Sequence, residues 1–149
     1  SYAKFLLIHP RPKTETEAKF SLEYCVARAL LDGEIGIGQF TPEKIKDVRV
    51  RSLIPKVHPD YYEAENEGGR EPLYPVEVRV IMKSGCVYSV RAEYAKGTRQ
   101  IPFTDAEREA KLRQCCLGIL AEDRTAQLAE QLRRFEAIPD IAAFVGIVA

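Results

Sequence analysis

The sequence predicts an α+β fold, a two-layer sandwich in which an antiparallel sheet has helices packed on one face. Three observations lead to this class: helical segments with both ends marked, one clear β-hairpin in the middle of the chain, and more helical segments after it. The 149 residues are long enough for one domain with its own core, and 46% hydrophobic with 30% charged residues is ordinary for a globular protein.

The first elements are a strand and a helix. Tyr2–Ile8 is expected to be a strand, and a helix is expected over Thr14–Leu31. Thr14 and Glu17 have the spacing of a capping box, and Gly33 suits a left-handed C-terminal cap. Because this helix is apolar on most faces, we expect it to be buried in a core or clamped against a second domain.

A second helix and a loop follow. Thr41-Pro42-Glu43 combines an N-cap residue, a proline at the first helical position and a carboxylate in the first turn, so a helix should run to about Leu53. Lys56–Asp60 is expected to be a short strand. Tyr61–Pro72 is acidic and contains two adjacent glycines, which favours a mobile loop.

The hairpin is the clearest β-structure in the sequence. Val76–Met82 and Cys86–Tyr94 alternate with period two around a glycine-containing turn. Val76, Val78 and Val80 should face helices, whereas Glu77 and Arg79 should be more exposed.

The last third of the chain, about 120–149, is expected to be helical. Before it, Thr104 and Glu107 form a second capping box that should open a helix to about Leu117. Further helices fit Arg124–Glu136 and Asp140–Val148.

Composition excludes several classes of function. Lys+Arg and Asp+Glu both number 22, so the net charge is zero and does not favour nucleic acid. No apolar run is long enough for a membrane span. The four cysteines form no C-x-x-C pair, which argues against a metal site and favours reduced thiols in the cytoplasm. No metal or other cofactor is expected.

A strand that begins at the first residue suggests a domain excised from a longer chain.

An ordered series of short motifs resembles the C-terminal domain of the MmgE/PrpD family, from about His9 to Leu112. The motifs are Pro10-x-Pro12, Glu17-Ala18-Lys19-Phe20-Ser21-Leu22-x-Tyr24, Ala29-Leu30-Leu31-Asp32-Gly33, Phe40-Thr41-x-Glu43, Val48-Arg49 with Leu53, Lys83-x-Gly85, Tyr94-x-x-Gly97, Pro102-x-Thr104 and Lys111-Leu112. Members of this family include 2-methylcitrate dehydratase, cis-aconitate decarboxylase and an iminodisuccinate epimerase.

The resemblance implies the lid domain of a larger two-domain lyase that acts on a small polycarboxylate. The expected activity is like that of 2-methylcitrate dehydratase, a hydro-lyase of propionate metabolism. The resemblance also implies that the main acid and base residues lie in a helical domain upstream of residues 1–149, that the full-length protein is a homodimer, and that the fragment alone is inactive. Epimerisation or decarboxylation within the same family remains an alternative.

Candidate site residues lie near the start of the first long helix. His9 is a candidate catalytic residue in a proline-stiffened turn, or else an ordinary surface histidine. Lys19 and Ser21 could bind a substrate carboxylate near a helix N-terminus. Alternatively, Lys19 extends to water and Ser21 bonds to its own helix.

A second group of candidates follows the hairpin. Lys96 and Arg99 flank Gly97 and could clamp a carboxylate, with Arg99 binding in a bidentate manner. If so, this loop should lie on the same side of the domain as His9. The alternative is a solvated turn. Two further functions remain open: a small-molecule-binding α+β module without catalysis, and a protein-interaction domain that uses the apolar first helix and C-terminus.

Overall fold

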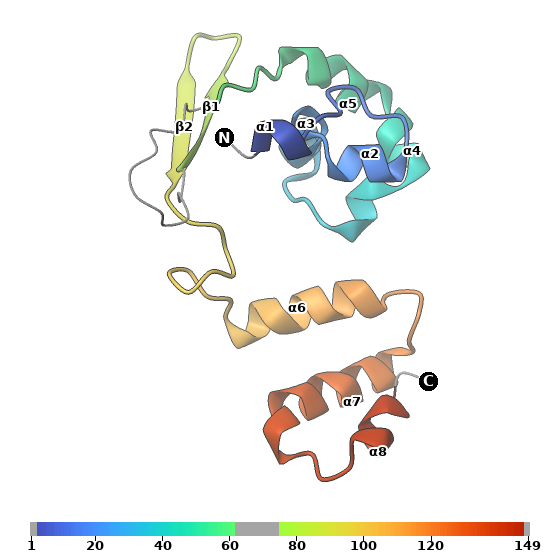
Figure 1. Ribbon diagram of the computed structural model, residues 1–149. Coiled ribbons are helices and arrows are strands. Elements are labelled where there is room, and N and C mark those ends of the chain that lie inside the picture. Colours follow the sequence, from blue (N-terminus) through green and yellow to red (C-terminus); the bar gives the residue numbers. More distant parts are fainter. Residues whose placement is uncertain (1–2, 62–74, 148–149) are drawn as a thin grey trace. The chain divides into compact units, whose positions relative to one another are not determined.

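The computed structural model describes residues 3–61 and 75–147 (Figure 1). The chain divides into two compact units, Ser1–Ala95 and Lys96–Ala149, and each is described by itself. Unit 1 holds helices and a two-stranded antiparallel sheet, and unit 2 is helical. The α+β class is therefore confirmed. The expected loop at Tyr61–Pro72 lies outside the described residues except for Tyr61. No helix within the described ranges is both long and apolar enough to cross a bilayer.

The helices of unit 1 are short. They are α1 (Ala3–Leu6), α2 (Glu15–Lys19), α3 (Leu22–Asp32), η1 (Ile37–Phe40), α4 (Pro42–Lys46), α5 (Val48–Leu53) and η2 (Ile54–Lys56). The strand expected at Tyr2–Ile8 is wrong, because Ala3–Leu6 is helical. The apolar residues of this segment are consecutive rather than alternating. A strand also needs a partner strand, and no other part of the described chain pairs with this segment.

The helix expected over Thr14–Leu31 is two helices, α2 and α3. Ser21 has extended backbone angles, and its hydroxyl accepts a hydrogen bond from the Tyr24 N–H, so α3 starts afresh at this residue. The cap at Thr14 is confirmed, because its hydroxyl accepts from the Glu17 N–H. The Glu17 carboxylate accepts from the Lys13 N–H at 2.7 Å, one residue before the expected partner.

The segment after Thr41 is also interrupted. Thr41 caps α4 as expected, but Asp47 ends this helix and caps α5 by accepting from the Arg49 N–H at 2.9 Å. Pro55 lies inside η2 rather than beyond the last helical turn. The strand expected at Lys56–Asp60 is wrong, since Lys56 ends η2 and the following residues pair with no strand of the described chain.

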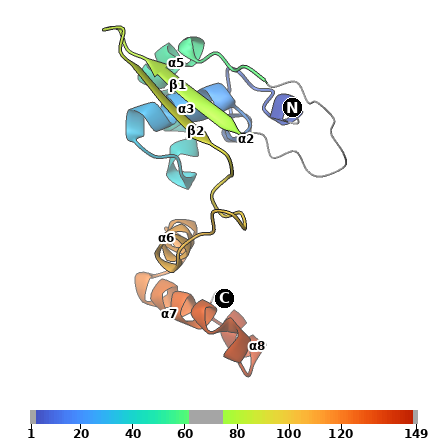
Figure 2. The same cartoon turned by 90° about the vertical axis from the view of Figure 1, so that its left-hand side faces the viewer.

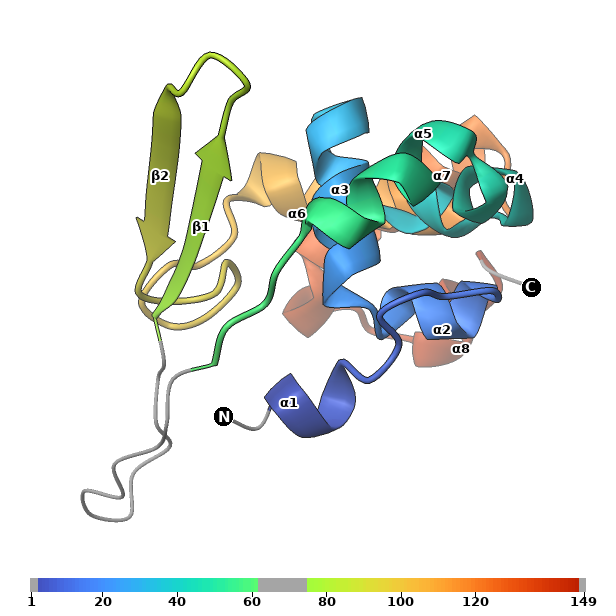
Figure 3. The same ribbon diagram turned by 90° about the horizontal axis from the view of Figure 1, so that it is seen from above.

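The core of unit 1 lies where α3 packs against α5 and η2 (Figure 3). Its members come from α2 to η2 and are buried apolar side chains: Ala18, Tyr24, Ala27, Ile45, Val50 and Ile54. Their burial removes apolar surface from water and fixes the backbone of the helices on which the candidate residues lie.

The β-hairpin is confirmed, with β1 (Val76–Ile81) pairing antiparallel to β2 (Val87–Ala92) (Figure 2). The register sets Val78 opposite Val90 on an apolar face and Glu77 opposite Arg91 on the other face, which is polar except for the pair of Ile81 and Val87. The expectation that the three valines would be covered by helices is wrong for Val76, which is 60% exposed, and for Val78, which is 41% exposed, whereas Val80 is half-buried. Alternation along a strand identifies an apolar face but not what covers it.

Unit 2 contains three α-helices and one short 3₁₀ helix in its described part. They are α6 (Asp105–Cys116), α7 (Glu122–Arg133), η3 (Phe135–Ala137) and α8 (Ile141–Val145). The capping box of Thr104 and Glu107 is confirmed at the start of α6. The helix expected over Arg124–Glu136 begins two residues earlier and ends before η3. Cys116, Leu128 and Ile147 form the buried cluster of this unit.

Candidate functional site

Three of the expected site residues, His9, Lys19 and Ser21, lie at or beside the junction between α2 and α3. The His9 N–H donates to the Phe20 carbonyl oxygen at 3.3 Å, which holds the His9 turn beside this junction. Lys19 is the last residue of α2 and is exposed, and His9 is half-buried. Lys19 is thus at the end of α2 and two residues before the N-cap of α3, not within the first turns of one long helix.

Ser21 has a defined structural task at this junction. It is fully buried, and its Oγ accepts from the Tyr24 N–H at 3.1 Å. The hydroxyl oxygen therefore satisfies one of the free N–H groups at the start of α3. This contact agrees with the alternative in which Ser21 bonds to its own helix, and contact with a substrate stays a prediction.

A buried ion-pair network lies further along α3. The Arg28 guanidinium is fully buried and contacts Asp32 (Nη2 to Oδ1, 2.7 Å) and Asp47 (Nη1 to Oδ2, 3.1 Å). Lys44 Nζ is 3.0 Å from the Asp32 carboxylate, and Arg49 Nη2 is 2.8 Å from that of Asp47. Each carboxylate is therefore bound by two cations, which compensates the cost of burying the Arg28 charge.

These contacts keep both carboxylates ionised. Hydrogen bonds from Arg28 and then Lys44 lower the pKa of Asp32 to about 2. Hydrogen bonds from the Arg49 side chain and N–H, and then from Arg28, lower the pKa of Asp47. A carboxylate with a low pKa is a poor general base near neutral pH. The network therefore supports the fold by joining α3 to the α4–α5 junction.

Sequence reasoning missed this network. Arg28 and Asp32 are four residues apart on one helix, a spacing that brings opposite charges together and could have been noticed. The contact from Arg28 to Asp47 spans 19 positions and leaves no local pattern.

In unit 2, the loop that carries Lys96 and Arg99 is closed by several contacts. The Gly97 N–H donates to the Ile101 carbonyl at 2.8 Å, and Gly97 has a φ of +90°. A Cβ at this position would lie 2.5 Å from Cε2 of Phe103. Only glycine fits there, because the backbone angle is left-handed and the Phe103 ring occupies the space of a side chain.

Lys96 is anchored to the start of α6. Its Nζ lies 2.9 Å from the Glu107 carboxylate and 5.9 Å from the centroid of the Phe103 ring. The Glu107 carboxylate also accepts from the Thr104 N–H at 2.8 Å. This backbone hydrogen bond, followed by the one from Lys96, lowers the pKa of Glu107 to about 2. Lys96 therefore positions the loop.

Arg99 lies at the centre of the closed loop, between Gly97 and Ile101, and it is exposed. Its guanidinium is available to a planar oxyanion from solvent, the geometry in which arginine binds carboxylates best. Lys96 and Arg99 belong to unit 2, whereas His9, Lys19 and Ser21 belong to unit 1. That the two groups share one side of the domain stays a prediction.

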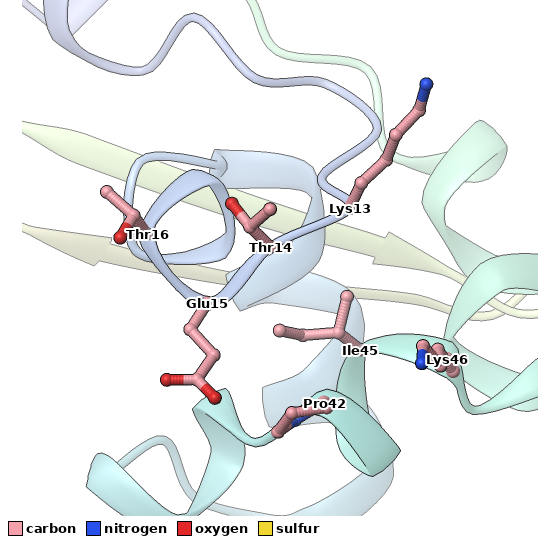
Figure 4. A pocket seen from close by; sticks show the side chains of 7 residues that line it. All are labelled: Lys13, Thr14, Glu15, Thr16, Pro42, Ile45 and Lys46. Carbon is pink, nitrogen blue, oxygen red and sulfur yellow. The ribbon is translucent and has the colours of Figure 1, made fainter.

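A pocket of 380 Å³ lies between the start of α2 and α4. It is lined by Lys13, Thr14, Glu15, Thr16, Pro42, Ile45 and Lys46. The Lys13 side chain extends away from the other lining residues (Figure 4). One carboxylate, two amines and two threonine hydroxyls line the pocket, and no histidine is among the lining residues. Within the described ranges, no three His, Cys, Asp or Glu side chains gather as a metal site.

Comparison with known proteins identifies the class to which this fold belongs. The MmgE/PrpD C-terminal domain matches residues 3–136. The chain belongs to the MmgE/PrpD family. Among curated proteins, it is 25% identical over 142 residues to cis-aconitate decarboxylase of Mus musculus and 27% identical over 139 residues to that of Homo sapiens. Each match covers 93% of this chain, which spans 28% of the length of either relative.

Proposed function

We propose that this chain is the lid domain of a longer MmgE/PrpD-type lyase that acts on a small polycarboxylate. The observation that carries the proposal is the family match over residues 3–136, together with decarboxylase relatives that are more than three times longer than the matched part. Decarboxylases are lyases, so the relatives favour this class of enzyme over a non-catalytic binding module.

The role proposed for the chain is to bind carboxylate groups and to close the site. Chemistry next to a carboxylate begins with removal of a proton from carbon, and it needs cations for the carboxylates and for the charge that develops. Arg99 is the residue of this chain best suited to that task, since its exposed guanidinium lies on a loop fixed by Gly97 and Lys96. His9 and Lys19 are secondary candidates.

Two reactions compete within this proposal. Dehydration of 2-methylcitrate is the activity expected from the sequence motifs. Decarboxylation of cis-aconitate is the second candidate, because both curated relatives carry this name. Either reaction would use the same lid, because both substrates present several carboxylates to cations.

Turnover by the full-length polypeptide distinguishes these reactions. The purified protein is incubated in parallel with 2-methylcitrate, cis-aconitate and iminodisuccinate, and products are identified by mass spectrometry. Loss of water from 2-methylcitrate or of carbon dioxide from cis-aconitate supports the lyase proposal and selects the reaction. Epimerisation of iminodisuccinate alone would contradict the lyase class, and no turnover of any of the three would contradict the proposed substrate group.

A further inference from the structure

A second pocket of unit 1, with a volume of 260 Å³, is lined by two arginines and three apolar residues. The arginines are Arg11, in the turn before α2, and Arg51, in α5. The other lining residues are Pro12, Ile54 and Pro55. This volume is below the range of about 300 to 1,000 Å³ for pockets that hold drug-sized ligands, so the pocket suits a smaller molecule.

Both guanidinium groups lack a partner of opposite charge among the residues that the structure describes. Neither Arg11 nor Arg51 forms a side-chain hydrogen bond or an ion pair with any residue in 3–61 or 75–147. Arg49, two positions before Arg51 on the same helix, is paired with Asp47 at 2.8 Å. Two like charges beside one pocket repel each other, and an anion between them removes this cost.

The pocket is lined by three apolar residues besides the two arginines. Pro12 is buried, and Ile54 is 7% exposed and belongs to the core cluster of unit 1. An ion without carbon, such as phosphate, makes no favourable contact with such walls. An organic acid can place its carbon chain against the proline and isoleucine side chains while its carboxylates reach the arginines.

We propose that Arg11 and Arg51 form a binding site for a small di- or tricarboxylate. All the residues of the site belong to unit 1, and the proposal does not rest on the proposed lyase activity. Each guanidinium donates hydrogen bonds to a carboxylate, and the apolar walls select an organic anion over an inorganic one. Because both arginines are open to solvent, affinity is weak, on the order of 1 mM in dissociation constant at low salt, and decreases as salt screens the charges.

The test is a titration of the ¹⁵N-labelled 149-residue chain with tricarballylate, followed by NMR. The backbone amides of the residues around the pocket should shift on binding, namely those of Arg11, Lys13, Arg51, Ser52, Leu53, Ile54 and Lys56. Arg11→Gln and Arg51→Gln should each weaken binding about tenfold, as expected for loss of one charged hydrogen bond. Arg79→Gln is the matched control, since it removes the same charge from an exposed hairpin site. The spectrum of each variant shows whether it is folded.

Three results would overturn the proposal. The first is unchanged affinity in either pocket variant. The second is an equal loss in Arg79→Gln, which would indicate attraction by overall charge. The third is phosphate binding as tightly as tricarballylate, since the apolar walls would then contribute nothing.

Discussion

Arg28 and Asp47 form an ion pair across 19 positions of the sequence, with Nη1 donating to Oδ2 over 3.1 Å. The guanidinium of Arg28 is fully buried, and its other side is held by Asp32 on the same helix. This contact joins α3, which begins at the junction carrying His9 and Lys19, to the start of α5. The junction is therefore held in place by a charged network as well as by apolar packing.

We expect Arg28→Ala to lower the free energy of unfolding by about 3 kcal/mol, because it removes the buried partner of two carboxylates. Removal of one partner of a buried ion pair usually costs about 3 to 5 kcal/mol. The loss here should be at the lower end of that range, since Lys44 and Arg49 still bind Asp32 and Asp47. Urea unfolding followed by circular dichroism measures it. Arg79→Ala, at an exposed position of β1, should change stability by no more than about 0.5 kcal/mol. Equal effects of the two substitutions would show that the network is not stabilising.

Acid should weaken the same network. The pKa of Asp32 is about 2 in the folded state, against an ordinary value of 3.8. The unfolded state therefore binds more protons between these values, and the free energy of unfolding falls as the pH falls from about 4 to about 2. Urea unfolding at a series of pH values should show this decrease, and Asp32→Asn should show a smaller slope over that range. An unchanged slope in Asp32→Asn would contradict the assignment.

Gly97→Ala should open the loop that carries Arg99. Alanine is strained at a φ of +90°, and its Cβ would meet the Phe103 ring. Gly85→Ala is a matched control, because its φ is +86° but no atom lies within 4 Å of the new Cβ. Gly85→Ala should lower the free energy of opening its own turn by roughly 1 to 2 kcal/mol. Gly97→Ala should lower that of the Lys96–Phe103 loop by at least about 1 kcal/mol more.

Amide hydrogen exchange measures this difference in each loop. The N–H groups of residues 97 and 85 donate to Ile101 and Met82, so each reports on its own turn. Adding Phe103→Ala to Gly97→Ala should restore part of the protection of the residue 97 N–H against exchange. Equal exchange in the two single variants would show that the Phe103 contact does not matter.

Arg99→Ala in the full-length enzyme should lower kcat/KM by roughly 10- to 100-fold, the effect of one lost charged hydrogen bond. Arg99→Lys should restore only part of the activity, because an ammonium cannot form the bidentate contact. Arg134→Ala, another exposed arginine of unit 2, is the control and should leave kinetics unchanged. If Arg99→Ala is as active as Arg134→Ala, Arg99 is an ordinary surface charge.

Features that depend on contacts between residues three or four positions apart could be predicted from the sequence. The caps at Thr14, Thr41 and Gly33 and the box of Thr104 with Glu107 depend on local spacing, and the structure contains each of them except for the second half of the box at Thr14. The hairpin likewise depends on local features, namely alternation of apolar and polar residues in each strand and a glycine-containing turn between the strands. These features are fixed by backbone hydrogen bonding near the residue itself.

Features that depend on distant contacts could not be predicted. Ser21 and Asp47 interrupt apolar segments that would allow continuous helices, and their capping is favoured because each new helix packs into the core of unit 1. The sequence placed Lys96 and Gly97 on a loop after the hairpin, and the structure has a closed turn there. Nothing in the sequence indicated that Glu107 holds Lys96, or that Arg11 and Arg51 share a pocket, because tertiary packing makes both contacts.

The central proposal is that this chain is one part of a lyase and does not hold the complete active site. The most direct measurement is turnover of 2-methylcitrate and cis-aconitate by the purified 149-residue chain, compared with the full-length polypeptide at equal concentration. We expect activity in the full-length protein and none in the isolated chain, since the main acid and base residues are expected in the rest of the polypeptide. Turnover by the isolated chain, after removal of host enzymes, would contradict the lid assignment.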